Sequence, residues 1–142
     1  MLLLTMKRQW IEYRDEWSRE PMTYWVHREA DGKPWYEAEV FDPPRPVPVP
    51  GRGWPVYFAE IDGFTFRFAS LAEMEVCIET LSRKVLPTTR RLTEERATCY
   101  GPNHHWLSRM PKGTKSWSYR QKAVTYLRMA KRQFEQEVGR SI

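Results

Sequence analysis

Apolar and polar positions alternate most clearly in two neighbouring runs, Val56 to Ile61 and Phe64 to Phe68. Asp62-Gly63 separates them, and this dipeptide is favoured in two-residue hairpin turns. The pattern predicts an antiparallel hairpin with one apolar set on its core face: Tyr57, Ala59, Ile61, Phe64, Phe66 and Phe68. On the other face we expect Phe58 opposite Arg67, as a cation-π pair, and Glu60 beside Thr65.

Two later segments show the three-and-four spacing of amphipathic helices. The first begins at Ser70-Leu-Ala-Glu73, a capping box, and ends before Pro87. Its apolar stripe is Leu71, Met74, Ile78, Leu81 and Val85, which predicts a helix over residues 70–85. The second begins near Ser116 or Ser118, where Ser118 to Gln121 resembles a capping box, and runs to Val138 before Gly139. Its stripe is Ala123, Leu127, Ala130, Phe134 and Val138.

The first third of the chain gives a less regular pattern. Trp10, Tyr13 or Arg14, and Trp17 recur at helical spacing, which predicts a short helix, although Ile11 and Tyr13 also suit a strand. Residues 22–26 and 35–41 are predicted to form a second hairpin around Asp31-Gly32. Residues 43–53 are rich in Pro and Gly, so we expect a stiff connector; a ligand for a proline-recognition domain is the alternative. Residues 87–115 are expected to form a long loop with a helical turn near Thr93 to Ala97.

Together these elements predict an α+β fold for the 142 residues, as one domain spanning residues 1–142. The expected sheet is antiparallel, has about four strands from two hairpins, and is covered on one face by the helices at 70–85 and 117–138.

Charge is sorted along the chain. Residues 1–81 carry 9 Lys and Arg against 14 Asp and Glu, whereas residues 82–142 carry 14 against 4. The basic C-terminal half predicts an acidic partner, either nucleic acid or a protein surface. The apolar N-terminal run is too short for a signal or a membrane span, so a cytoplasmic location away from membranes is expected, with Cys77 and Cys99 as reduced thiols. Oligomeric state stays open.

Rings and cations interleave most densely ahead of the last helix and on its first turns. Aromatic rings stack on bases while cations hold phosphate, a composition that suits single strands or RNA. On the last helix, four residues spaced by three or four form one exposed strip; a solvated helix face is the alternative. The candidate contact residues are Trp106, Arg109, Lys112, Lys115, Trp117, Arg120, Gln121, Arg128 and Arg132, with Thr125 completing the strip. Trp106 and Trp117 serve equally well as anchors for the long loop.

Catalytic chemistry finds little support in the sequence. Cys99, His104 and His105 have the side chains of zinc ligands, but their spacing matches no common zinc module. The same residues are weaker candidates for a Cys-His nucleophile. Glu60 with Asp62, and Glu94 with Glu95, are the carboxylate pairs considered for acid-base roles, and both pairs also suit ordinary turns. No phosphate loop or nucleotide fingerprint is present, so no cofactor and no enzymatic activity are expected.

The run from Gly101 to Lys112, Gly-Pro-Asn-His-His-Trp-Leu-Ser-Arg-Met-Pro-Lys, resembles small uncharacterised proteins of bacterial mobile elements and phages. The resemblance covers residues 57–130 and carries no residue roles. It implies a setting of nucleic-acid handling, or of interference with a host complex that handles nucleic acid.

These observations lead to two hypotheses. The first is a small basic protein that binds nucleic acid through its basic-aromatic C-terminal region. The second is an adaptor or inhibitor of the mobile-element or phage type, which docks on an acidic protein or on a nucleic-acid-handling complex.

Overall fold

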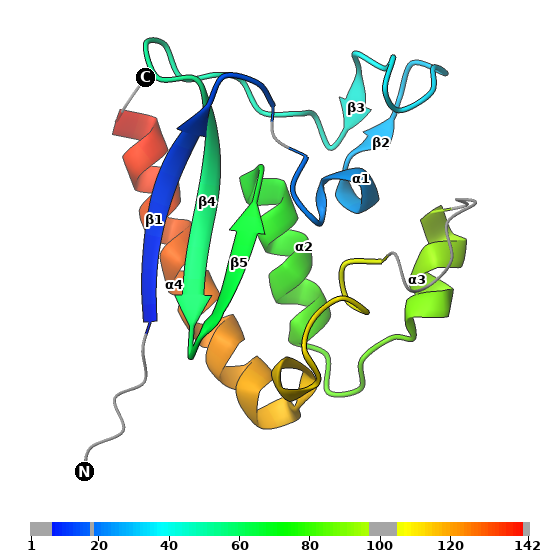
Figure 1. The fold of residues 1–142 in the computed structure, drawn as a ribbon, viewed down its shortest axis with the longest axis vertical. Coiled ribbons are helices and arrows are strands. Elements are labelled where there is room, and N and C mark those ends of the chain that lie inside the picture. Colours follow the sequence, from blue (N-terminus) through cyan, green and yellow to red (C-terminus); the bar gives the residue numbers. More distant parts are fainter. Residues whose placement is uncertain (1–6, 18, 97–104, 141–142) are drawn as a thin grey trace.

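The centre of the molecule is a three-stranded antiparallel sheet with strand order β1-β4-β5 (Figure 1). The computed structural model describes residues 7–17, 19–96 and 105–140. The strands are β1 (Lys7–Arg14), β4 (Trp54–Ile61) and β5 (Phe64–Phe68). Because β4 is the central strand, its residues are buried along most of its length.

The hairpin of β4 and β5 forms as the alternation predicts. Asp62 and Gly63 both adopt positive φ, 51° and 90°, as a two-residue hairpin turn of this class requires. Phe58 lies opposite Arg67, and the Thr65 hydroxyl donates to Glu60 at 3.4 Å. Arg67 forms an ion pair with Glu20 at 3.3 Å.

The segment predicted as an N-terminal helix is a strand, and this prediction was wrong. β1 pairs with β4 along its whole length, from Lys7 opposite Ile61 to Arg14 opposite Trp54. The alternation of β1 explains the result. Ile11 packs against the core, while on the opposite face Trp10 stacks on Phe58 with centroids 5.1 Å apart and Arg14 lies over the same ring. Pairing with a neighbouring strand outweighed the helical spacing of the aromatic residues.

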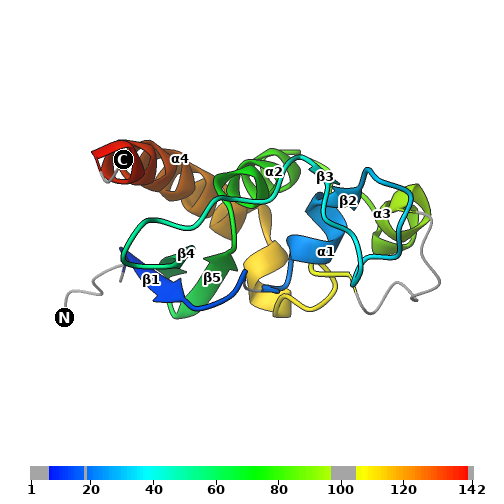
Figure 2. The ribbon, with the colours of Figure 1, turned by 90° about the horizontal axis from the view of Figure 1, so that it is seen from above.

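Two helices cover one face of the sheet, as expected (Figure 2). They are α2 (Leu71–Leu81) and α4 (Trp117–Arg140). Met74, Ile78 and Leu81 of α2 and Ala123, Leu127, Ala130 and Phe134 of α4 are buried, and together with the hairpin they form the core. The fold class is therefore α+β. Helix α2 ends earlier than predicted, since Val85 lies beyond it and is 82% exposed.

The predicted first hairpin is also wrong in most of its length. Residues Thr23–Val26 form a single helical turn, α1, and the strands β2 (Arg28–Glu29) and β3 (Phe41–Asp42) pair over two residues each. Asp31 is not a turn residue of a tight hairpin. Its carboxylate accepts the backbone N–H groups of Lys33, Glu39 and Val40, which stabilises a wider loop and lowers the pKa of Asp31.

The expected long loop of residues 87–115 contains more regular structure than predicted. Helix α3 (Thr89–Arg96) begins earlier than the expected turn, and the 3₁₀ turn η2 (Lys112–Lys115) leads directly into α4. Ala97 lies outside the described residues.

Among the described residues, no helix combines the length and the apolar composition needed to cross a membrane.

Candidate functional site

The buried side chain of Arg120 connects several segments of the basic half of the chain. It is 5% exposed, and its guanidinium donates to the backbone carbonyls of Lys115, Leu81, Arg83 and Lys84. These four carbonyls belong to the end of α2, the residues after it, and η2. One guanidinium thus fastens the end of α2 to the beginning of α4, and burial lowers its pKa.

Arg120 also brings several cationic side chains together at one end of the molecule. Arg83, Lys84 and Lys112 are exposed around it, and Lys115 is half-buried. The indole of Trp117 is 37% exposed and has the Arg120 guanidinium 5.0 Å from its ring centroid. We call this surface the basic end, comprising Arg83, Lys84, Lys112, Lys115, Trp117, Gln121 and Arg128.

A hollow of about 270 Å³ lies within the basic end, between α2 and α4. Trp117, Gln121, Thr125 and Arg128 line it from α4, and Leu81 at the end of α2 and Ser82 just after it line the other side. Three members of the predicted strip therefore face one depression, next to an exposed aromatic ring. An indole, an amide and a guanidinium in this arrangement can stack on a base, hydrogen-bond its edge and hold a phosphate.

Towards the end of α4, carboxylates surround the predicted strip. Arg132 lines an adjoining groove together with Glu75, Glu79 and Glu135. Lys131 pairs with Glu75 at 3.5 Å and with Glu135 at 3.2 Å. Carboxylates on both helices thus border this second groove, which makes it a poor surface for phosphate. Arg128 lines both this groove and the hollow of the basic end, whereas Arg132 lines only the groove. We therefore do not include Arg132 in the basic end.

Three other predicted contact residues lie outside the basic end. Trp106 is only 6% exposed and belongs to the core, so it anchors the loop, which was the alternative interpretation. Arg120 is buried, and its guanidinium donates to backbone carbonyls instead of facing solvent. Arg109 is exposed but lines a different hollow, along β5 beside Phe66. Conversely, Arg83 and Lys84 are exposed just after α2 and belong to the basic end, although they were not among the predicted contact residues. Two adjacent cations were the available signal in the sequence.

The candidate metal ligands can be placed only in part. Cys99 and His104 lie outside the described residues. His105 is buried, its Nδ1 accepts the Leu107 N–H at 3.0 Å, and burial lowers its pKa to about 4. Within the part of the chain that the structure describes, no three His, Cys, Asp or Glu residues are grouped as a metal site requires.

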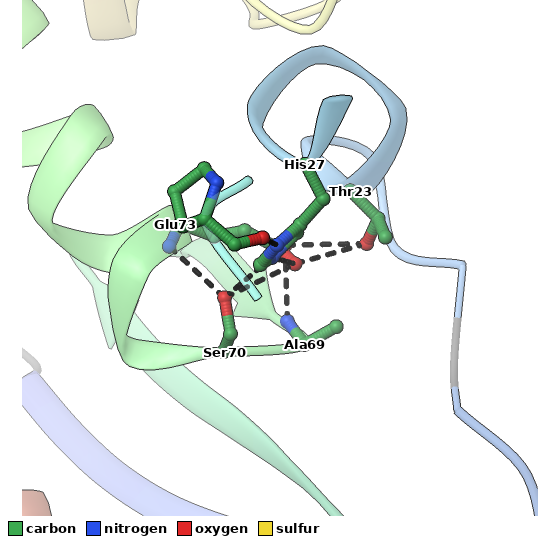
Figure 3. A network of polar contacts seen from close by, with 6 residues as sticks. Thr23, His27, Ala69, Ser70 and Glu73 are labelled. Carbon is green, nitrogen blue, oxygen red and sulfur yellow. Dashed lines mark hydrogen bonds and ion pairs between the residues drawn. The ribbon is translucent and has the colours of Figure 1, made fainter. Parts of the chain in front are cut away.

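A buried polar network not anticipated from sequence joins α1 to α2 (Figure 3). Glu73 is fully buried, and its carboxylate accepts from the Ala69 N–H at 3.0 Å and from the Thr23 hydroxyl at 3.1 Å. His27, also fully buried, lies with Nε2 3.1 Å from Glu73 and 2.8 Å from the Ser70 hydroxyl. Burial is the main cause that raises the pKa of Glu73.

The network contains a serine, a histidine and a carboxylate, but its geometry does not suit nucleophilic catalysis. In a catalytic triad the acid contacts one imidazole nitrogen and the serine the other. Here Ser70 and Glu73 both face Nε2, while Nδ1 of His27 donates to the carbonyl of Pro43 at 2.8 Å. Ser70 is 5% exposed, so a substrate cannot reach its hydroxyl. The network stabilises the packing of α1, the proline-rich connector and α2.

The other cysteine, Cys77, is equally unsuited to chemistry. It is fully buried on α2, carries a free thiol, and burial raises its pKa strongly. A thiol in such surroundings is inert.

The fold and the basic end together define an α+β protein with a charged, aromatic surface at one end of its helical layer. No protein-family model, no curated protein and no solved structure matches the chain. The functional assignment therefore depends on the chemistry of the surface itself.

Proposed function

We propose that this protein binds nucleic acid in single-stranded form through the basic end, without catalysing a reaction. The observation that carries the proposal is the composition of this surface. Residues 82–92 and 105–134 contain no Asp or Glu. Among their cations, Arg128 lines the same hollow as the partly exposed ring of Trp117, and Arg83, Lys84 and Lys115 supply the carbonyls that hold the Arg120 guanidinium beside that ring. A flat, largely uncharged surface would give no such preference for phosphate.

The expected mode of binding follows from the hollow between α2 and α4. A base stacks on Trp117, and Gln121 and Thr125 offer hydrogen-bonding groups to its edge. Arg128 on one side, and Lys112 and Lys115 on the other, contact the phosphates that flank that base. Contacts of this kind tolerate many sequences, because every base offers a flat face for stacking.

The test is a pair of charge-matched double variants. Lys112→Glu with Arg128→Glu reverses two charges of the basic end, and Lys33→Glu with Arg52→Glu reverses two exposed charges elsewhere. With a fluorescent single-stranded oligonucleotide and anisotropy as the readout, we expect the first variant to bind at least about tenfold more weakly than the wild type. The control variant should bind within about threefold of the wild type, since its net charge is the same as that of the first variant.

A protein partner is the competing outcome. The alternative of an adaptor that docks on an acidic protein requires the same cations, so charge reversal alone does not separate the two. A pull-down from lysate, with and without nuclease, does. Loss of the captured material after nuclease treatment supports the proposal, whereas an unchanged protein band together with no oligonucleotide binding at low salt would overturn it.

A further inference from the structure

The end of β1 lies at the opposite end of the sheet from the β4–β5 turn (Figure 1). The basic end adjoins the Asp62 turn, since Lys122 of α4 pairs with Asp62 at 2.8 Å. Arg14, at the far end of β1, borders instead an open pocket of about 670 Å³. The residues after β1 form one side of this pocket and residues 35–45 form the other. Its volume lies within the range of ordinary ligand sites.

Aromatic rings form the walls of this pocket. Trp17 lies with its ring centroid 5.7 Å from that of Trp35 and 5.1 Å from that of Phe41. Trp35 and Phe41 are themselves 4.6 Å apart, edge to face. Tyr36 lines the same pocket and is 72% exposed. The rings pack on one another, so a flat molecule that enters meets walls already held in place.

Trp17 also carries a buried polar group. Its indole N–H is buried and has no hydrogen-bond partner among the residues that the structure describes. A buried donor without a partner is costly, by about 1–3 kcal/mol, and is uncommon in native proteins. Because the N–H itself is buried, a ligand in the pocket would meet the ring of Trp17 and not this donor.

Charged groups of both signs surround the opening. Arg19 and Arg45 line the pocket, are exposed, and form no ion pair within the described part of the chain. Asp15 and Glu16 line it as well. Guanidinium groups bind phosphate through paired hydrogen bonds, while carboxylates accept from the amino groups of bases. A free phosphate offers these carboxylates nothing to accept from, whereas a base offers them amino groups.

We propose that this pocket binds a mononucleotide, with its base among the aromatic walls and its phosphate on Arg19 and Arg45. A ligand that combines a flat ring, hydrogen-bond donors and acceptors, and an anionic group complements the aromatic, acidic and basic side chains of this lining. The carboxylate of Asp15 or Glu16 accepts from the exocyclic amino group of the base, which favours amino-bearing bases. This site is separate from the basic end and does not rest on the function proposed for it.

The test is a titration of the full-length protein with AMP, CMP, GMP and UMP, followed by the ¹H–¹⁵N signals of the indole groups. The Trp17→Phe variant identifies the Trp17 signal, and intrinsic fluorescence gives an independent readout. We expect a saturable shift of the Trp17 signal with at least one amino-bearing nucleotide. Arg19→Glu and Arg45→Glu should each weaken this binding at least about tenfold, because each replaces a phosphate contact with a repulsive charge. Arg52→Glu, on the same connector but outside the pocket, should leave it unchanged.

Three results would overturn the proposal. The first is the absence of a saturable shift with all four nucleotides at millimolar concentration. The second is an equal response to inorganic phosphate alone, which would mean an anion site without base recognition. The third is equal binding by the wild type and both arginine variants. The double variant of Lys112 and Arg128 separates the two sites, because it should lose oligonucleotide binding and retain the Trp17 response.

Discussion

At the scale of single residues, Glu73 combines two roles that usually belong to different side chains. As the last residue of the Ser70–Glu73 capping box it was expected in the first turn of α2, and the Ser70 hydroxyl does accept the Glu73 N–H at 3.1 Å. Its own carboxylate, however, accepts the N–H of Ala69, one residue before the cap, and turns into the protein towards His27 and Thr23. Glu73, whose N–H is capped by Ser70, is therefore also the centre of the buried network.

Replacement of Glu73 by Gln should destabilise the protein in a pH-dependent way. A glutamine amide cannot accept from all the donors around Glu73, so we expect a loss of about 1–3 kcal/mol in the free energy of unfolding. Because burial raises the pKa of Glu73 above its ordinary value of 4.5, the folded protein holds a proton that the unfolded chain releases. The stability that comes from this retained proton is fully present below pH 4.5 and is lost as the pH rises through the pKa of Glu73 in the folded protein.

Urea unfolding of the wild type and the Glu73→Gln variant, at about pH 4.5 and about pH 7, measures both effects. The difference in the free energy of unfolding between the wild type and the Glu73→Gln variant should be larger at the lower pH. Glu75→Gln is the matched control, since Glu75 lies on the same helix, is exposed, and should change stability by about 0.5 kcal/mol or less. A difference that grows with rising pH would contradict the assignment.

The burial of Glu73 shows where residue-level inference from sequence stops. The capping box was readable because its members lie within four positions of one another. The partner His27 lies 46 positions away, and nothing local to either residue indicates that they meet. Lys and Glu are almost never fully buried, so the default expectation for Glu73 was a solvated side chain. A contact over such a separation arises from the folding of α1, which the sequence pattern also missed.

At the scale of elements, α1 was misassigned because its β-branched and aromatic residues favour a strand. The structure gives a physical reason for the helical turn. Thr23 and His27 both reach Glu73, and residues four apart are about 6 Å apart along a helix but about 13 Å apart along a strand. A strand could not bring both side chains to one carboxylate. By contrast, the β4–β5 hairpin, α2 and α4 were predictable, since each has a long periodic stripe and its own turn or cap.

Arg120 should prove to be the most important arginine for the stability of α2 and α4. Arg120→Met removes every donor to the carbonyls of Leu81, Arg83 and Lys84 while it retains much of the side-chain volume. We expect a loss of about 2–4 kcal/mol, measured by urea unfolding. Arg120→Lys should recover little of this, because a single ammonium cannot replace the planar guanidinium fork.

The control for Arg120 is Arg132→Met on the same helix. Arg132 is exposed, so its replacement should change the free energy of unfolding by about 0.5 kcal/mol or less. Equal stabilities of the Arg120→Met and Arg132→Met variants would mean that the carbonyl contacts do not fasten α2 to α4. Arg120 was predicted to contact phosphate because the sequence does not show which carbonyls the fold places beside it. Its contacts with those carbonyls are what bury the guanidinium.

At the scale of the whole molecule, the charge gradient along the chain becomes a separation in space. The acidic half supplies β1, the loops around β2 and β3, and α2, where several carboxylates have specific partners: Glu60 with Arg8, Glu20 with Arg67 and Glu12 with Arg14. The basic half supplies α3, η2 and α4, and part of its positive charge forms the basic end beside the first turns of α4. Sequence composition revealed the gradient, but the exclusion of Trp106, Arg109, Arg120 and Arg132 from the basic end required the fold.

This arrangement sets the salt dependence of the proposed nucleic-acid binding. Each phosphate neutralised on a single strand contributes about −0.7 to the slope of log K against log salt concentration. The basic end offers Arg83, Lys84, Lys112, Lys115 and Arg128 as cations, so the wild type should show a slope of about −3 to −4. Anisotropy titrations of a single-stranded oligonucleotide over a range of salt concentrations give this value.

The Lys112 and Arg128 double variant should reduce the slope to about −2, because two of the five phosphate contacts are removed. The Lys33 and Arg52 double variant should keep the wild-type slope, since those cations lie outside the basic end. Equal slopes for the two variants would mean that binding follows net charge and not this surface. A steeper wild-type slope would mean that cations outside the basic end, such as Arg132 or Arg109, also contact the strand. The slope thus counts the phosphates that the surface holds, which the affinity alone cannot do.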